Sequence, residues 1–227
     1  MMLCRWESLP KNMQNDEVRP YYDSLRDKKL SLFMKAIFDR TVAFIMLIVL
    51  LPVFILLALL IKVDSPGEVF FRQERVTKYG RKFRIHKFRT MVANAEKLGT
   101  QVTTKSDMRV TKIGHKLRGC RLDELPQLID ILQGNMSFVG TRPEVTKYVE
   151  QYTPEMLATL LLPAGVTSEA SIEYKDEERL LSDAENADKT YVEVVLPQKM
   201  EWNLNSLKEF SFLGDIKTMI KTVGAVV

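Results

Sequence analysis

Two adjacent carboxylates, Asp123 and Glu124, are the residues of this chain best suited to chemistry on a phosphate group. They belong to the run LDELPQL at residues 122–128. Their cationic neighbours along the chain are Lys116, Arg118, Arg121 and Arg142. A carboxylate beside guanidinium groups stays ionised, so it can attack phosphorus or hold Mg²⁺, which takes one or two carboxylates together with substrate phosphates. The alternative is structural, because acidic side chains also cap and stabilise helix N-termini.

The run KFRTM at residues 87–91 adds two further cations, Lys87 and Arg89, although an edge strand with solvated charges would look the same. The histidines, His86 and His115, have no Cys or acidic residue at metal-ligand spacing, so we interpret both as ordinary polar residues. The sequence contains no GxGxxG, Walker A, GxSxG, HExxH or DxD motif. The missing DxD argues against a sugar-nucleotide transferase that binds its metal through that motif.

The length of 227 residues allows one domain, or one domain with an anchor. Charged residues are distributed unevenly along the chain. Residues 62–121 contain 16 Lys and Arg against 5 Asp and Glu, whereas residues 122–227 contain 9 against 18. A basic middle segment favours anionic partners such as phosphates, lipid headgroups or nucleic acid. The two cysteines, Cys4 and Cys120, lie far apart without a CxxC spacing, which argues against a disulfide framework or a zinc site.

An apolar stretch without any charged residue covers the 21 positions 41–61. As a straight helix it would reach roughly 31 Å, enough to cross the hydrocarbon core of a bilayer. Hydropathy alone favours one spanning helix. However, Pro52 lies in the middle, where it kinks a helix, and basic residues flank both ends, so the positive-inside bias favours neither orientation. We therefore favour a re-entrant anchor that enters the membrane, bends at Pro52 and returns to the same face.

The remaining patterns predict an α+β fold that is mostly helical, with a small β-hairpin and amphipathic helices at the membrane interface. We expect a polar, loosely ordered arm at residues 1–32, the anchor at 33–63 and a catalytic domain at 64–227. The expected elements are strands at 69–73 and 82–87, helices at 91–98, 113–118, 123–133, 143–152, from 153 and at 212–222, a helix at 188–199 broken at Pro197, and loops at 100–107 and 165–168.

Together these residues resemble the bacterial sugar transferase family, the small monotopic phosphoglycosyl transferases, over roughly residues 33–225. The ordered motifs are IFDR at 37–40, Pro52, IKVDSPG at 61–67, VFFRQER at 69–75, KFRTM at 87–91, DMRVT at 107–111, LDELPQL at 122–128, GNMSFVG at 134–140 and RPE at 142–144. This combination is highly specific.

The resemblance implies transfer of a sugar-1-phosphate from a nucleotide diphosphate sugar, expected to be a UDP-sugar, to polyprenyl (undecaprenyl) phosphate, with release of the nucleoside monophosphate. It implies that Asp123 attacks phosphorus and carries the phosphosugar covalently, and that Glu124 helps to bind Mg²⁺ or to position the attacking groups. Lys87, Arg118 and Arg142 match phosphate-contacting positions, and we add Arg89 to this set. The expected location is the cytoplasmic face of the bacterial inner membrane, in contact with membrane lipid, as the first membrane step of glycoconjugate synthesis.

Two departures from the family pattern concern the donor site. Pro163 stands where the resemblance implies a phosphate-binding Arg, and the loop at residues 169–175 differs from the most familiar branch. Larger relatives have extra N-terminal spans and a further domain, which we do not expect here. One rival is a non-enzymatic peripheral membrane protein, whereas nucleic-acid binding is not expected because few aromatic residues accompany the basic segment. The sequence leaves the donor sugar and the oligomeric state open, with a homodimer as one alternative.

Overall fold

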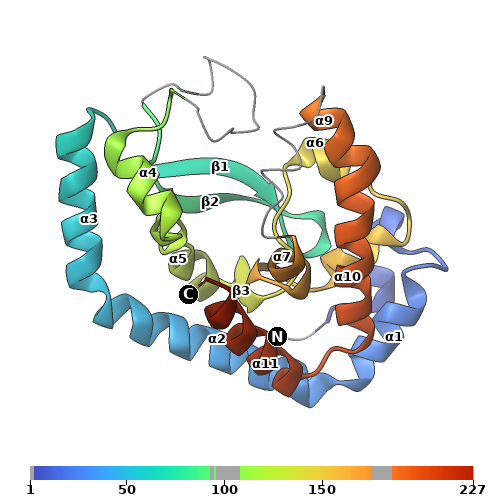
Figure 1. Cartoon of the computed structure of the whole chain (residues 1–227). Coiled ribbons are helices and arrows are strands. Elements are labelled where there is room, and N and C mark those ends of the chain that lie inside the picture. Colours follow the sequence, from blue (N-terminus) through green and yellow to red (C-terminus); the bar gives the residue numbers. More distant parts are fainter. Residues whose placement is uncertain (1–2, 93–94, 96–107, 175–185, 227) are drawn as a thin grey trace.

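The computed structural model describes residues 3–92, 95, 108–174 and 186–226. This part of the chain is mostly helical, as the sequence predicts, and it contains two small two-stranded sheets, of which only the hairpin is expected. Figure 1 shows α2 (Lys29–Val49) along the bottom of the molecule, α3 (Leu51–Asp64) rising at one side and α10 (Leu196–Lys208) at the other. The hairpin and α4 (Lys112–Gly119) lie between these helices.

The apolar stretch forms two helices rather than one, with a bend of 63° between α2 and α3. Among the described residues no single helix is both long and apolar enough to cross a membrane, and the pair passes that test only together. Pro52 lies in the first turn of α3, where the missing N–H is not needed, so the predicted bend at this proline is confirmed. The apolar side chains left exposed on the pair include Phe44, Ile45, Ile48, Val49, Leu51, Ile55, Leu56, Leu59 and Val63.

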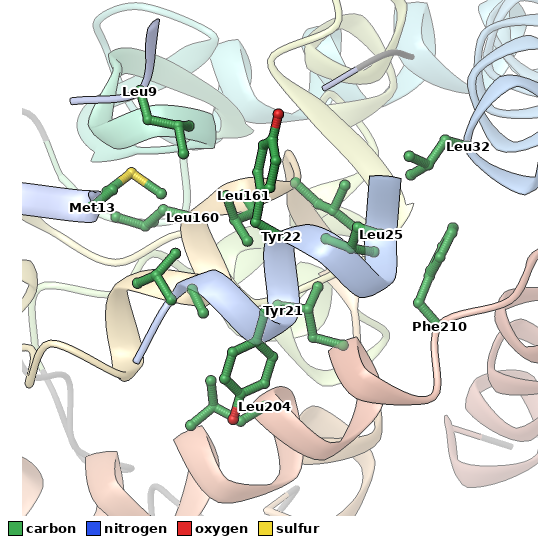
Figure 2. Close-up of a cluster of buried hydrophobic side chains, with 14 of the residues drawn as sticks. Leu9, Met13, Tyr21, Tyr22, Leu25, Leu32, Leu160, Leu161, Leu204 and Phe210 are labelled. Carbon is green, nitrogen blue, oxygen red and sulfur yellow. The ribbon is translucent and has the colours of Figure 1, made fainter. Parts of the chain in front are cut away.

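The N-terminal residues are folded, so the expectation of a loosely ordered arm is wrong for residues 3–28. The helix α1 (Arg19–Asp27) presents Tyr21, Tyr22 and Leu25 to the largest hydrophobic cluster of the described residues. Figure 2 shows these side chains packed among residues from near the N-terminus, the middle and the C-terminal part of the chain. Their spacing is that of one buried helix face, which the many polar residues around them conceal. The division into segments 1–32, 33–63 and 64–227 stays a prediction.

The predicted hairpin is confirmed and consists of β1 (Phe70–Val76) and β2 (Lys82–Phe88), paired antiparallel. The 3₁₀ turn η3 (Lys78–Gly80) connects them and uses left-handed backbone, with φ of 72° at Gly80. At its other end the hairpin is anchored by Phe88, which is buried against side chains of α3 and α4. This contact fixes the C-terminal end of β2 next to α3 and α4.

A second sheet was not predicted, because residues 165–168 have the composition of a loop. Three of them belong to β4 (Ala164–Thr167), which pairs in parallel with β3 (Met136–Val139). Gly165 permits this pairing, since a Cβ there would lie 2.2 Å from the backbone nitrogen of Gly140. Both strands have only four residues, so their sequence gives almost no alternation to detect.

The helices after the hairpin follow the prediction in part. The helix α4 is confirmed, and the Thr111 side chain caps it by accepting a hydrogen bond from the Gly114 backbone N–H. The expected helix at 91–98 is wrong at its start, because Met91 pairs with Val110 in an isolated bridge. Most of that expectation, the loop at 100–107 and Asp107 lie outside the described residues.

The C-terminal elements differ from the prediction mainly in length. They are α5 (Gln127–Leu132), α6 (Thr146–Val149), η6 (Met156–Leu161), α7 (Glu169–Glu173), α9 (Ala187–Thr190), η7 (Tyr191–Val195), α10 and α11 (Phe212–Val226). The expected helix at 143–152 is therefore only one turn, and the element after residue 153 is a 3₁₀ helix. The expected break at Pro197 lies close to a change of helix type, because η7 ends at Val195 and α10 begins at Leu196. A π-helical turn at η7 immediately precedes α10, so Pro197 falls in the first turn of a new helix, where no N–H is required.

Candidate active site

The segment that carries the two carboxylates is a tight 3₁₀ turn, η5 (Leu122–Glu124), between α4 and α5. Arg121 precedes it with φ of 55°, a left-handed conformation that is costly for a residue with a side chain. This turn separates η5 from α4, and the helix expected from residue 123 begins only at Gln127. Neither η5 nor α5 has a side-chain cap, so Asp123 does not cap a helix. No capping bond from Asp123 is therefore present, although both acids do lie in the first turn of η5.

Glu124 is held by two cationic side chains from distant segments. Its Oε1 accepts hydrogen bonds from Lys87 Nζ at 2.8 Å and from an Arg142 guanidinium nitrogen at 2.5 Å, while its Oε2 lies 3.4 Å from the other terminal nitrogen of Arg142. Its side chain is only 12% exposed. Burial acts to raise the pKa of Glu124, but the charges of Arg142 and Lys87 outweigh it and hold the pKa well below its ordinary value.

Asp123 lies in a different electrostatic environment from its neighbour. Burial raises the pKa of the Asp123 carboxyl, and the negative charge of Glu124 raises it further. Lys87 and Arg118 act in the opposite direction. Two adjacent acids thus have pKa values displaced in opposite directions, a pattern typical of functional sites.

Besides Asp123, four predicted site residues lie in this region: Lys87, Arg118, Glu124 and Arg142. Lys87 is near the end of β2, and Arg142 follows β3 in the loop that leads to α6. Arg118, in the last turn of α4, donates from Nε to the Thr90 hydroxyl at 2.9 Å. Lys87 and Arg142 contact Glu124, and Lys87 and Arg118 act electrostatically on Asp123, so these residues come together from separate segments of the chain.

Arg89 is placed differently from the other predicted cations. Its guanidinium donates to the carbonyl oxygens of Pro66 at 3.0 Å and Ser65 at 2.6 Å, and to the Ser65 hydroxyl at 2.9 Å. Arg89 is buried and binds the C-terminal end of α3, so a phosphate would have to displace these bonds. The geometry gives it a structural role, since it ties the C-terminal end of α3 to β2, the strand that carries Lys87.

Sequence reasoning missed two polar side chains beside this cluster, Arg75 and Gln127. Both line a small cavity together with Lys87, Arg142 and the side chains of Ile85 and Pro143. In β1 the more buried side chains alternate with exposed ones, and Arg75 is on the buried side. The sequence of β1 has no matching alternation of apolar and polar residues, so it gave no signal for the inward position of Arg75.

His86 has an acidic partner that its sequence neighbourhood does not reveal. Asp130, fully buried on α5, accepts a hydrogen bond from the His86 backbone N–H at 2.8 Å, and its other oxygen lies 2.8 Å from His86 Nδ1. His86 is therefore a buried polar residue whose acidic partner lies 44 positions away, which the sequence analysis did not foresee. The pair joins β2 to α5 next to Lys87.

A magnesium ion would find few protein ligands here. Among the described residues no group of three or more His, Cys, Asp or Glu side chains could hold a metal. Both carboxylate oxygens of Glu124 already contact cationic side chains, so Asp123 is the carboxylate of the pair that is better placed to bind a metal ion. This donor set fits Mg²⁺ only as an ion held mainly by substrate phosphates and water, with one carboxylate of the pair.

Comparison with known proteins identifies the family. The family model described as bacterial sugar transferase matches residues 30–227, which include the anchor helices, the hairpin and both carboxylates. The chain belongs to the bacterial sugar transferase family.

Several named proteins are similar in sequence to this chain. An Aeromonas hydrophila protein named UDP-N-acetylgalactosamine-undecaprenyl-phosphate N-acetylgalactosaminephosphotransferase is 34% identical, covering 89% of this chain and 46% of its own length. Two further proteins are named UDP-glucose:undecaprenyl-phosphate glucose-1-phosphate transferase. The one from Escherichia coli K12 is 35% identical, and the match covers 93% of this chain and 44% of its own length. The one from Caulobacter vibrioides is 31% identical, and the match covers 83% of this chain and 68% of its own length. The chain spans less than half the length of the first two relatives.

Proposed function

We propose that this protein transfers a sugar-1-phosphate from a nucleotide diphosphate sugar, a UDP-sugar by analogy with its relatives, to undecaprenyl phosphate. The observation that carries the proposal is the position of Asp123, a partly buried carboxylate without a capping role, beside Glu124 and within the electrostatic reach of Lys87 and Arg118. A nucleophile for phosphorus must approach a strongly anionic diphosphate, and this cationic environment reduces the repulsion between them.

The proposed reaction has two balanced steps. An Asp123 carboxylate oxygen attacks the β-phosphorus, and the bond from this phosphorus to the bridging oxygen breaks, so that the nucleoside monophosphate leaves with the electron pair. A phosphate oxygen of undecaprenyl phosphate then attacks the phosphosugar on Asp123, and the acyl phosphate bond breaks to restore the carboxylate. Neither attacking group needs to lose a proton if both are ionised. A covalent intermediate also removes the need to bind both large anions at the same time.

The surrounding side chains have separate roles in this scheme. Glu124 holds Lys87 and Arg142 in place, and Arg118 is oriented by its bond to Thr90. These three cations would bind phosphate oxygens and stabilise the charge that develops on the leaving phosphate. Mg²⁺ would neutralise part of the charge of the diphosphate, held by substrate oxygens and one carboxylate of the Asp123–Glu124 pair.

The bent pair of helices supplies the anchor in this proposal. Its exposed apolar side chains would enter one leaflet, and the 63° bend would return the chain to the cytoplasmic face. Arg89 connects the end of α3 to β2, two residues from Lys87. The catalytic groups would therefore be fixed near the interface, where a soluble nucleotide sugar and a membrane-bound lipid phosphate can meet.

The test is release of nucleoside monophosphate by the purified protein, with undecaprenyl phosphate, Mg²⁺ and a panel of UDP-sugars that includes UDP-glucose and UDP-N-acetylgalactosamine. We expect turnover with at least one donor, and loss of turnover in Asp123→Asn. Asp23→Asn is the matched control, since Asp23 is exposed and paired with Arg19 on α1. Near-normal turnover by Asp123→Asn would refute the assignment. Lipid binding without monophosphate release from any donor would favour the non-enzymatic membrane protein instead.

A further inference from the structure

A small cavity lies behind the cations that hold Glu124. Its lining includes three cationic side chains, Arg75, Lys87 and Arg142, and the polar side chain of Gln127. It is large enough for a water-sized group, such as a single phosphate oxygen. Lys87 and Arg142 are the same residues that contact Glu124, so the cavity adjoins the proposed active site.

Two buried polar atoms in the side chains that line this cavity have no hydrogen-bond partner. Arg75 donates from its terminal nitrogens to the Pro143 carbonyl oxygen at 3.2 Å and to Gln73 Oε1 at 2.7 Å, but its Nε–H has no acceptor. Gln127, only 2% exposed, has an unsatisfied Oε1. An unpaired buried polar group costs free energy, so its persistence beside a cavity indicates that something else pairs with it.

The charge of the lining favours an anion over a neutral ligand. Three cations line the cavity; Glu124 is bound to two of them, and the charge of Glu144 acts on the third, Arg75, so cations still outnumber these carboxylates. Burial lowers the pKa of the Arg75 guanidinium, yet an arginine side chain remains charged in proteins. A phosphate oxygen can accept from Arg75 Nε, and the Gln127 amide can turn over to offer its N–H₂ group, since its oxygen and nitrogen are nearly isosteric.

We propose that Arg75 and Gln127 form an inner subsite that receives a phosphate oxygen of the diphosphate donor. The inference rests on the proposed function for the identity of the donor, whereas its anion chemistry follows from the cavity alone. Arg75 is then a substrate-binding residue, and Gln127 connects the subsite to the run of residues that contains Asp123. The competing occupant is an ordered water, which would accept from Arg75 and donate to Gln127.

The test measures binding of inorganic pyrophosphate by isothermal titration calorimetry, with no donor or lipid present. We expect the wild-type protein to bind pyrophosphate, and Arg75→Gln to weaken binding by about tenfold or more, as loss of a charge-assisted hydrogen bond predicts. Gln127→Glu should weaken it at least as much, because it places a negative charge in the subsite. Arg84→Gln is the matched control on the same hairpin, since Arg84 is exposed and its guanidinium donates to the Arg72 carbonyl oxygen, away from the cavity lining.

Additional variants and the monophosphate-release assay distinguish a failure of the subsite proposal from misfolding and from a failure of the proposed function. If Arg75→Gln does not fold, Arg75→Lys, which keeps the charge and loses the Nε donor, and Gln127→Glu still test the proposal. Pyrophosphate binding that is absent in the wild type, or unchanged in the Arg75 and Gln127 variants, would overturn the subsite and leave the cavity with an ordered water only. Arg75-dependent binding without monophosphate release from any UDP-sugar would instead refute the proposed function and leave the subsite standing.

Discussion

Glu124→Gln removes the negative charge shared by Lys87 and Arg142 and keeps almost the same side-chain shape. In the wild type this carboxylate makes contacts of 2.8 Å to Lys87 and 2.5 Å to Arg142, and its side chain is 12% exposed. Removing one partner of a buried ion pair costs about 3–5 kcal/mol. The Arg142 side chain is 34% exposed, so solvent screens part of its share, and we expect a loss of roughly 2–4 kcal/mol in the free energy of unfolding.

The same substitution has a pH dependence with a definite sign. The pKa of Glu124 is lower in the folded protein than in the unfolded chain, so its charge stabilises the fold above the unfolded pKa of about 4.3 and that stability is lost as pH falls through the folded pKa. Asp123 acts in the opposite sense, because its folded pKa is raised and its contribution is lost as pH rises. The difference in stability between wild type and Glu124→Gln should therefore shrink as the pH falls below about 4.

Glu124→Gln should also change the titration of Asp123. Burial is the main cause of the raised Asp123 pKa, and the neighbouring charge of Glu124 adds to it. Removing that charge, and freeing Lys87 to act on Asp123, should lower the pKa of Asp123. The acid limb of the pH–rate profile for monophosphate release should then move to lower pH, whatever happens to the maximal rate.

Thermal unfolding in detergent micelles and the pH–rate profile are the two assays. A loss of roughly 2–4 kcal/mol in a domain of this size lowers Tm by roughly 5–15 °C. Glu74→Gln is the matched control, because Glu74 pairs with Lys82 at the exposed end of the hairpin and its loss should leave Tm nearly unchanged. A Tm for Glu124→Gln at or above that of the wild type, with an unmoved acid limb, would refute this reasoning.

Three further substitutions test other parts of the structure by thermal unfolding. Gly114→Ala should destabilise the protein by about 1–3 kcal/mol or more, because the new Cβ would lie 2.0 Å from the Thr90 carbonyl oxygen, and Gly119→Ala, with open space, is its control. Lys35→Met should cost about 3–5 kcal/mol, since buried Lys35 pairs with Asp39 at 3.7 Å and Asp215 at 2.6 Å; an unchanged Tm would contradict this role. Asp130→Asn should cost about 1–3 kcal/mol by weakening both bonds to His86, and no loss would show that the pair does not secure β2 to α5.

Local patterns in the sequence predicted the elements whose signals are short-range. The hairpin follows from two β-type runs around a Gly80 turn, and the bend follows from Pro52 within an uncharged stretch. The second sheet could not be predicted, because β4 pairs with a strand nearly thirty residues away and its register depends on the close approach of Gly140 and Gly165. The order of residues 3–28 was missed because their few buried side chains are dispersed among polar ones.

The candidate site shows the same limit. Charge and family resemblance identified Asp123, Glu124 and three of their cations, since those residues lie in dense motifs. Arg89 carries the same charge as Lys87, but it is turned toward the end of α3, and only the fold reveals this. The His86–Asp130 pair joins residues 44 positions apart, so no spacing rule would have found it.

The most direct test of the account is mass spectrometry of the peptide containing Asp123 after incubation with the donor UDP-sugar and Mg²⁺, without undecaprenyl phosphate. The account predicts a phosphosugar adduct on Asp123 that forms in the wild type, is absent from Asp123→Asn and disappears when undecaprenyl phosphate is added. Monophosphate release at the normal rate with no adduct on this peptide at any time would contradict Asp123 as the covalent nucleophile.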